Sequence, residues 1–260
     1  MQKIIDAHAH LGYWPTLAKA KEMLIYSTNK NKVNFTLFSF DGTEVSGEHK
    51  NKIVPQIEGS KKALSFVKKY PDRFGMLIRC RPRFEKNIQE LDTFISKHRE
   101  FIYGLKFHPY TSQLKITDPR NYPYFYLAKK YNLPILVHTA NDKYSKLIYM
   151  DRVCKKFNDL TFIAAHCELL SDHLITIEVL KNNPNLYCDT AWVDMKFIKL
   201  LKANDLMDRI MFGTDNPIDG FETLDEQIYQ DYFHNKIRLS NKDYQKLMYY
   251  NAKKVYKINL

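Results

Sequence analysis

Lys3-Ile4-Ile5-Asp6-Ala7-His8-Ala9-His10 opens the chain with a short apolar run that ends in two histidines. Such a run, followed by a longer stretch of helical spacing, is typical of a strand in a parallel sheet that helices cover. Seven more runs of this kind follow, each separated from the next by an amphipathic stretch. The eight expected strands are residues 3–8, 33–40, 74–79, 102–107, 135–138, 161–165, 186–189 and 210–213.

The segments between the expected strands have helical spacing. The expected helices lie near residues 16–28, 59–70, 84–98, 122–131, 143–157, 172–182, 195–203 and 221–235. Eight strand–helix units predict one α/β domain over residues 1–260, a single (β/α)₈ barrel of the TIM type, whereas a doubly wound sheet is the rival architecture. Ser240 begins a capping-box pattern that predicts one or two additional C-terminal helices.

The composition limits the class of protein. Of the 260 residues, 45% are hydrophobic, and no apolar run reaches the roughly 18 residues of a transmembrane helix. The N-terminus lacks the pattern of a signal peptide, so we expect a cytoplasmic protein without a membrane partner. The four cysteines are widely spaced, which predicts buried free thiols.

The net charge of +11 raises the question of nucleic-acid binding. The positive charge comes from 31 Lys and 9 Arg, and the lysines are dispersed along helix-like stretches. Proteins that bind phosphates concentrate basic residues on one face or use arginine forks. The charge pattern therefore favours a solvated helical surface, and a small molecule as the partner rather than a nucleic acid.

Histidines and an aspartate follow several of the expected strands. In a closed barrel these strand ends converge on one mouth, where barrel enzymes have their active sites. Burying many such groups together is costly without a function, and imidazole with carboxylate suits zinc, manganese, iron or cobalt. The candidates are His8, His10, His108, His138, His166 and Asp215.

Five motifs in this order extend the pattern over the whole chain. They are Asp6-Ala7-His8-Ala9-His10, Gly104-Leu105-Lys106-Phe107-His108-Pro109, Val137-His138-Thr139, Ala165-His166-Cys167 and Gly213-Thr214-Asp215. Together they resemble the amidohydrolase superfamily, in its amidohydrolase-related branch. That branch includes aminocarboxymuconate-semialdehyde decarboxylase, related aromatic-acid decarboxylases and lactone hydrolases.

The resemblance implies roles for five residues. His8, His10, His138 and Asp215 would hold one divalent ion, with zinc expected before manganese, iron or cobalt. His166 would hydrogen-bond the metal-bound water or the substrate carbonyl, and Asp215 would accept a proton from that water. Binding to a metal lowers the pKa of water toward about 7, which makes it a nucleophile at neutral pH.

Lys106 and His108 leave alternatives open. In binuclear relatives a lysine on the fourth strand is carboxylated and bridges two metals. The Lys-x-His-Pro form here resembles the mononuclear branch, so a structural Lys106 paired with Asp6 or another interior acid is the main expectation. His108 is expected to contact substrate, and a supporting hydrogen bond is its alternative role.

Arginines and aromatic residues after strand ends are candidates for substrate binding. Arg79 and Arg81 close the third expected strand, and arginine forks match carboxylates. Their alternative is pairing with rim acids such as Asp41 or Glu85. Three aromatic residues could wall an apolar pocket or could simply pack: Trp14, Tyr110 and Trp192.

These features predict a metal-dependent hydrolase that cleaves an amide, ester or lactone of a small carboxylate-bearing molecule. Non-oxidative decarboxylation or hydration of an unsaturated or aromatic acid at the same site is the alternative. A TatD-type nuclease is a weaker one, since that family usually has a glutamate where this chain has Lys106-Phe107-His108. A non-enzymatic basic binding protein is weaker still. The resemblance also allows a homodimer.

Overall fold

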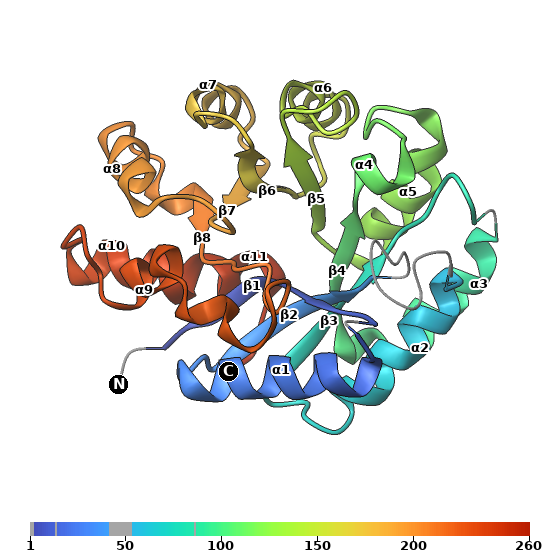
Figure 1. Cartoon of the computed structure of the whole chain (residues 1–260). Helices are drawn as coiled ribbons and strands as arrows, with labels where there is room; N and C mark the ends of the chain where they lie inside the picture. The colour runs from blue at the N-terminus through green and yellow to red at the C-terminus, as the bar shows by residue number, and fades with distance from the viewer. Residues whose placement is uncertain (1–2, 14, 42–53, 86) are drawn as a thin grey trace.

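A sheet of eight parallel strands in sequential order forms the centre of the molecule (Figure 1). The computed structural model describes residues 3–13, 15–41, 54–85 and 87–260. Its strands are β1 (Ile5–Leu11), β2 (Phe35–Phe40), β3 (Phe74–Arg79), β4 (Ile102–Phe107), β5 (Ile135–Ala140), β6 (Phe162–Leu169), β7 (Leu186–Asp189) and β8 (Ile210–Met211).

Backbone hydrogen bonds join the first strand to the segment that contains and follows the last one. The amide of Ala7 donates to the carbonyl of Phe212 at 2.9 Å, and the amide of His10 donates to that of Asn216 at 2.8 Å. These bonds close the sheet, so the (β/α)₈ barrel expected from the sequence is confirmed.

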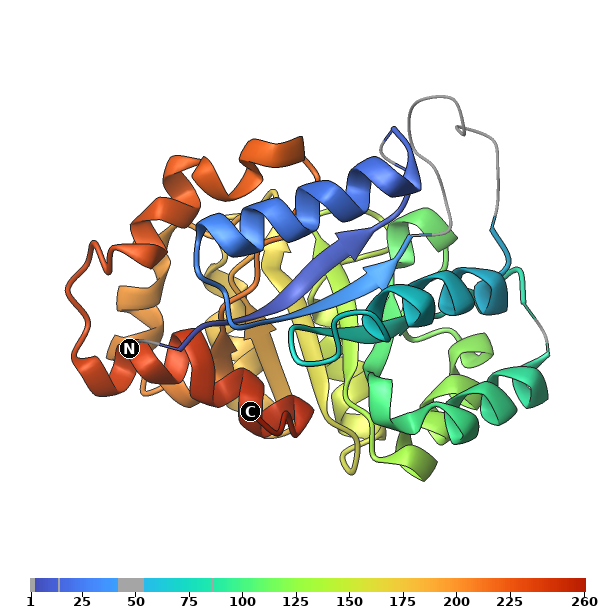
Figure 2. The same ribbon diagram turned by 90° about the horizontal axis from the view of Figure 1, so that it is seen from below.

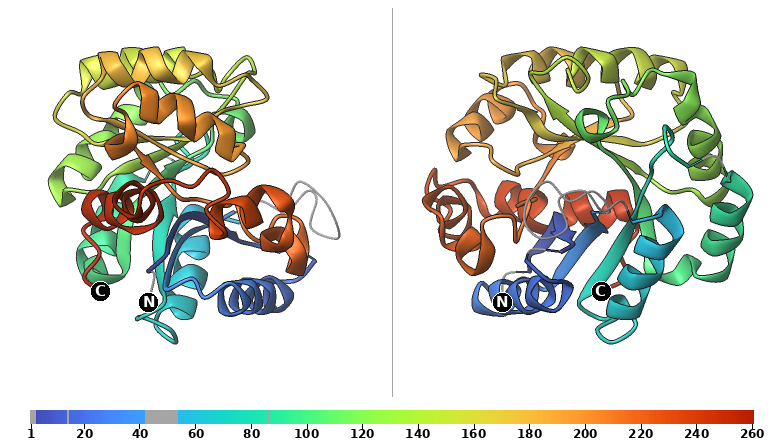
Figure 3. Two further views of the ribbon diagram at one scale, coloured as in Figure 1. Left: turned by 90° about the vertical axis from the view of Figure 1, so that its left-hand side faces the viewer. Right: turned by 45° about the vertical axis from the view of Figure 1, so that its right-hand side comes forward.

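Helices surround the strands as an outer ring (Figures 2 and 3). They are α1 (Leu17–Lys30), α2 (Gln56–Val67), α3 (Ile88–Lys97), α4 (Pro109–Ser112), α5 (Tyr122–Tyr131), α6 (Ile148–Lys156), α7 (Leu174–Asn182), α8 (Met195–Ala203), α9 (Gln227–Phe233), α10 (Asn241–Gln245) and α11 (Asn251–Tyr256). No helix in the described part of the chain is long and apolar enough to cross a membrane.

Some boundaries differ from the expected ones for local reasons. α6 begins at Ile148 rather than near 143, because the Asp142 carboxylate accepts from the amides of Tyr144 and Ser145 and holds them in a turn. β8 ends at Met211, because the amide of Phe212 donates to the carbonyl of Leu247 instead of continuing the sheet. The one-turn helix α4 is absent from the sequence-based expectation. The Ser240 cap is confirmed, since its hydroxyl accepts from the amide of Asp243 at 3.1 Å.

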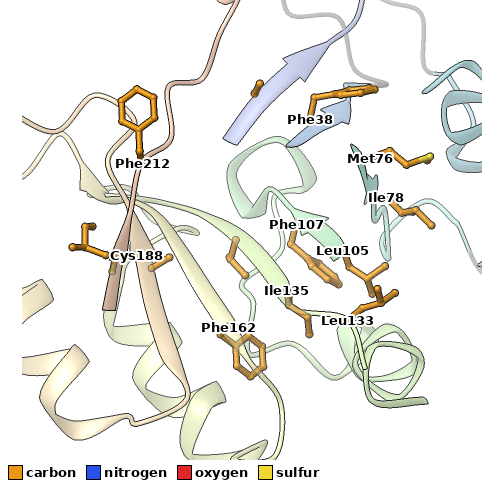
Figure 4. Packing of buried hydrophobic residues seen from close by; sticks show 14 of the residues in the cluster. Phe38, Met76, Ile78, Leu105, Phe107, Leu133, Ile135, Phe162, Cys188 and Phe212 are labelled. Atoms are coloured by element: carbon orange, nitrogen blue, oxygen red, sulfur yellow. The ribbon is translucent and has the colours of Figure 1, made fainter. Parts of the chain in front are cut away.

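The main core lies between the strands and the helices. Side chains that alternate along the strands point outward and are buried there, as Figure 4 shows for Ile78, Leu105, Ile135 and Phe162. This alternation follows from the period of two in a strand. The opposite positions therefore face the barrel interior.

A second, smaller core fills that interior. Leu77 and Leu136 precede Arg79 and His138 by two residues and so share their inward face. They cluster with residues from the C-terminal segment, among them Tyr249 and Tyr256. Two helical segments, the π-helical Lys246–Tyr250 and α11, supply these residues and cover the barrel end opposite its mouth.

Removing the Tyr256 side chain should therefore destabilise the barrel. Tyr256 is buried, with 3% exposure, and truncating a large buried aromatic side chain to alanine typically costs about 3–5 kcal/mol. Urea unfolding followed by circular dichroism measures the free energy of unfolding of Tyr256→Ala. Tyr250→Ala is the matched control, because Tyr250 is 56% exposed in the preceding turn and its loss should be much smaller. Equal losses in the two variants would contradict this role of the C-terminal segment.

Candidate metal centre

Polar side chains from several strands lie together at the barrel mouth. Burying each of them alone would cost free energy. His8 and His10 come from β1, Lys106 from β4, and His166 from β6, while Asp215 follows β8. All five are buried, although a chain of this size could expose them easily. The structure thus brings together most of the residues that the sequence singled out at strand ends.

Asp215 lies between the two histidines of β1. Its Oδ1 is 3.0 Å from His8 Nε2 and 2.7 Å from His10 Nε2. The ligand atoms of these three side chains all lie within 4.8 Å of one another, a grouping that could hold a metal ion. Gly213 permits this approach, because a Cβ there would lie 2.9 Å from the Cβ of His8.

Two carboxylates orient the imidazoles of β1. His10 Nδ1 lies 2.6 Å from Asp41 Oδ2, and His8 Nδ1 lies 2.9 Å from Asp189 Oδ2. A carboxylate can only accept, so each Nδ1 carries a proton, and His10, with a carboxylate oxygen at both ring nitrogens, donates from both when no ion is bound. This carboxylate–histidine arrangement is the usual support of metal-binding histidines. Asp41 and Asp189 were not assigned this role from the sequence, although both stand at strand ends.

The carboxylates of Asp41 and Asp215, on either side of His10, require a positive charge between them. Burial disfavours a charged His10, but the carboxylates of Asp41 and Asp215 outweigh it and raise its pKa to about 9. Burial would also favour a neutral Asp215, yet the nearby histidines hold the pKa of its carboxyl well below the usual range. A divalent ion meets the same requirement, and the two imidazoles with one carboxylate are a donor set that suits it.

Lys106 completes this cluster from the barrel interior. Its Nζ lies 2.6 Å from His8 Nε2, and burial lowers its pKa to about 8. The ammonium group thus contacts a histidine rather than Asp6. Asp6 accepts instead from the hydroxyl of Thr214 at 2.6 Å, and burial raises its pKa to about 7.

His166 and His138 form a second pair of imidazoles. His166 Nδ1 lies 3.1 Å from the carbonyl oxygen of Ala191, so it donates there and leaves Nε2 as an acceptor. This Nε2 lies 3.1 Å from His138 Nδ1. Burial lowers the pKa of His166, so the imidazole is neutral at physiological pH. The Sγ of Cys167 donates to the carbonyl of Asp189, and all four cysteines are free and buried, as expected.

The candidate substrate-binding residues have different surroundings. The ring of His108 stacks on that of His138, with centroids 3.9 Å apart. Arg79 donates to Asp41 Oδ1 at 3.2 Å and to the hydroxyl of Thr111 at 2.9 Å. Arg81 instead donates to the backbone carbonyl of Val54, beside the start of α2. Trp14 lies outside the described residues.

Imidazoles and a carboxylate converge at the mouth of a closed (β/α)₈ barrel. This arrangement is typical of barrel proteins that bind a metal ion there. Sequence comparison identifies the family among them. A family model described as amidohydrolase matches residues 5–258, and the chain belongs to this family. Comparison with curated proteins finds no match.

Solved structures share the fold at low sequence identity. The 5-carboxyvanillate decarboxylase of Novosphingobium aromaticivorans, with bound manganese and 3-methoxy-4-hydroxy-5-nitrobenzoic acid, has a TM-score of 0.73, 12% identity, and coverage of 99% of this chain and 97% of that one. A probable 2-pyrone-4,6-dicarboxylic acid hydrolase of Acinetobacter baumannii with bound citric acid has a TM-score of 0.69, 12% identity, and coverage of 99% and 100%. The 2,6-dihydroxybenzoate decarboxylase from Rhizobium has a TM-score of 0.65, 15% identity, and coverage of 99% of both chains.

The donor set predicts one divalent ion per chain. Elemental analysis of protein purified without chelators, and again after reconstitution with zinc or manganese, measures the stoichiometry. His8→Ala should lose the ion, because Nε2 of His8 faces Asp215, whereas His166→Ala should keep it. Two ions per chain would favour a bridging Lys106. A His166→Ala protein that binds no ion would show that His166 is a ligand.

Proposed function

We propose that this chain is a metal-dependent enzyme acting on a small molecule that carries a carboxylate. The observation that carries the proposal is the charge of the mouth. Arg79 and Lys106 supply two positive charges, and Asp41, Asp189 and Asp215 supply three negative ones. A divalent ion would therefore leave a net charge of +1, which an anionic substrate would balance.

Asp6 cancels only part of this positive charge at neutral pH. Burial raises its pKa to about 7, so it is about half protonated there. Before an ion binds, Lys106 is mostly charged, with its pKa near 8. The buried surroundings also strengthen each electrostatic interaction, because little water is present to screen it.

Each site residue has a proposed role in the reaction. His8, His10 and Asp215, whose ligand atoms lie together, and His138, which the family resemblance adds, would be the ligands of the ion, and the ion would supply Lewis-acid polarisation of a substrate oxygen or of water. Asp215 remains ionised and can accept a proton. His166 is neutral, with an unprotonated Nε2, so it can accept a proton first and return it later.

Hydrolysis of an amide, ester or lactone is one reaction that fits this site. It needs a proton acceptor for water and a proton donor for the leaving group. Asp215, after β8, and His166, on β6, provide such a pair. Zinc is the first candidate for the ion, since imidazole and carboxylate ligands suit it.

Non-oxidative decarboxylation is the second candidate, and the comparisons favour it. Two of the three structures described above are decarboxylases of substituted benzoic acids, and one of them holds manganese. Loss of carbon dioxide from such an acid leaves a carbanion that one proton must quench. That proton must come from water, taken up first at Nε2 of His166 and then passed to the carbon.

Isotope incorporation separates the two reactions. Aromatic and unsaturated acids, with their amides and lactones, would be incubated with the zinc- or manganese-loaded protein in H₂¹⁸O or D₂O and analysed by mass spectrometry. Hydrolysis places one ¹⁸O in the product, whereas decarboxylation releases carbon dioxide and places one deuterium on carbon. In either case His166→Ala should lower the rate by about 10²–10⁴. A loaded protein that transforms only neutral compounds would contradict the proposal.

Arg79 is the proposed partner of the substrate carboxylate. It uses only part of its guanidinium on Asp41 and Thr111, and arginine has five donors. Arg79→Ala should lower kcat/KM for the acid by tenfold or more, with little change for its methyl ester. Arg83→Ala is the control, since Arg83 is exposed on the same segment and donates to the carbonyl of Ser112. Equal losses of kcat/KM for the acid and the ester would mean that Arg79 only holds Asp41 in place. Arg81, which lies against Val54, is the weaker candidate.

A further inference from the structure

A tight turn follows β7 beside the metal centre. The amide of Val193 donates to the carbonyl of Thr190 at 3.0 Å, which closes a four-residue turn. Trp192 is the third residue of this turn and has a φ of 60°. Glycine or asparagine usually takes this left-handed conformation, so a bulky aromatic residue there requires support from its surroundings.

Hydrogen bonds fix this turn to the strands on both sides. The amide of Ala191 donates to Asp189 Oδ1, and its carbonyl accepts from His166 Nδ1, both at 3.1 Å. The hydroxyl of Thr190 bonds both backbone polar groups of Gly213. The backbone at Trp192 is therefore held in place by contacts to β6 and to the segment after β8.

The indole of Trp192 reaches the carboxylate at the centre of the site. Its Nε1 donates to Asp215 Oδ2 at 3.1 Å, while Oδ1 of the same carboxylate faces His8 and His10. The Trp192 ring packs edge-on against that of Tyr229, with centroids 5.6 Å apart. Tyr229 is fully buried, and its hydroxyl donates to the carbonyl of Thr214. Both the ring and the backbone of Trp192 thus fix where its N–H points.

We propose that Trp192 is a positioning residue that orients Asp215 for ion binding. By occupying Oδ2, its indole N–H leaves Oδ1 as the single oxygen offered toward the histidines. An indole can only donate and does not titrate, so it holds the carboxylate of Asp215 in one orientation as long as that carboxylate is ionised. A hydrogen bond to an ionised acceptor is also stronger than one between neutral groups. This inference rests on the proposed ion site.

The hydrogen bond can be observed directly, with or without an ion. The chain has two tryptophans, so a ¹H–¹⁵N spectrum contains two indole signals, and Trp192→Phe identifies one of them. We expect the Trp192 signal to exchange slowly with solvent and to shift when Asp215→Asn removes the charge of its acceptor. A Trp192 signal that exchanges freely and ignores Asp215→Asn would overturn the contact.

Ion affinity tests the positioning role. Trp192→Phe keeps an aromatic ring against Tyr229 but removes the N–H, and loss of such a support typically weakens metal binding about 10–100-fold. Competition with a chromophoric chelator measures the dissociation constant for zinc or manganese. Tyr229→Phe is the matched control, because it keeps the indole donor and removes only a hydroxyl bound to the backbone. Its effect should be much smaller.

A double-mutant cycle separates orientation of Asp215 from general loosening of the turn. In an Asp215→Ala background, Trp192→Phe should have no further effect on affinity, because the indole acts only through that carboxylate. If Trp192→Phe weakened ion binding as much in the Asp215→Ala background as in the wild type, the proposal would be overturned. Equal ion affinity of the wild type and Trp192→Phe would overturn it as well. A wild type that binds no ion would overturn the proposed function and this role together, whereas an ion bound equally by both proteins overturns only the role of Trp192.

Discussion

Buried carboxylates at the barrel mouth require positive charge close to them, and the surrounding side chains supply it. Asp215 stays ionised because the imidazoles near it hold its pKa low. Lys106 and Arg79 contribute positive charge from β4 and β3, and both are buried. Moving any one of these groups away would leave an unbalanced charge in a medium with little water, at a cost of several kcal/mol. This charge balance therefore constrains how strands that lie far apart in the sequence are placed relative to one another.

The same constraint fixes how each imidazole is protonated. His8 and His10 donate from Nδ1 to carboxylates, and His166 donates from Nδ1 to a backbone carbonyl. Nε2 accepts in His8 and His166, from Lys106 and His138, whereas in His10 it carries a proton that a bound ion would replace. Side chains held in this way lose little freedom on binding a ligand, so the residues of the proposed site are already ordered without an ion.

The sequence was sufficient for the barrel because its strand-like and helix-like runs alternate eight times without a break. It was also sufficient to collect His8, His10 and Asp215 at one end, since the topology of a barrel brings strand ends together. The direction of Arg81 could not be predicted in this way, because the path of the segment after β3 turns it toward Val54. The indole contact of Trp192 was equally hidden, because it depends on a left-handed backbone that a tryptophan rarely adopts.

The groups that would hold the ion stand on strands or next to them, whereas exposed residues of the segments after β3 and β4 border the mouth. Phe84 and Tyr110 are 48% and 59% exposed, and neither contributes to the buried charge balance. Changes at such positions leave the buried charge balance intact, so the border of the mouth can vary while the buried side chains stay in place. A library of variants confined to Phe84 and Tyr110 would therefore alter the border of the mouth and leave the proposed ion site unchanged.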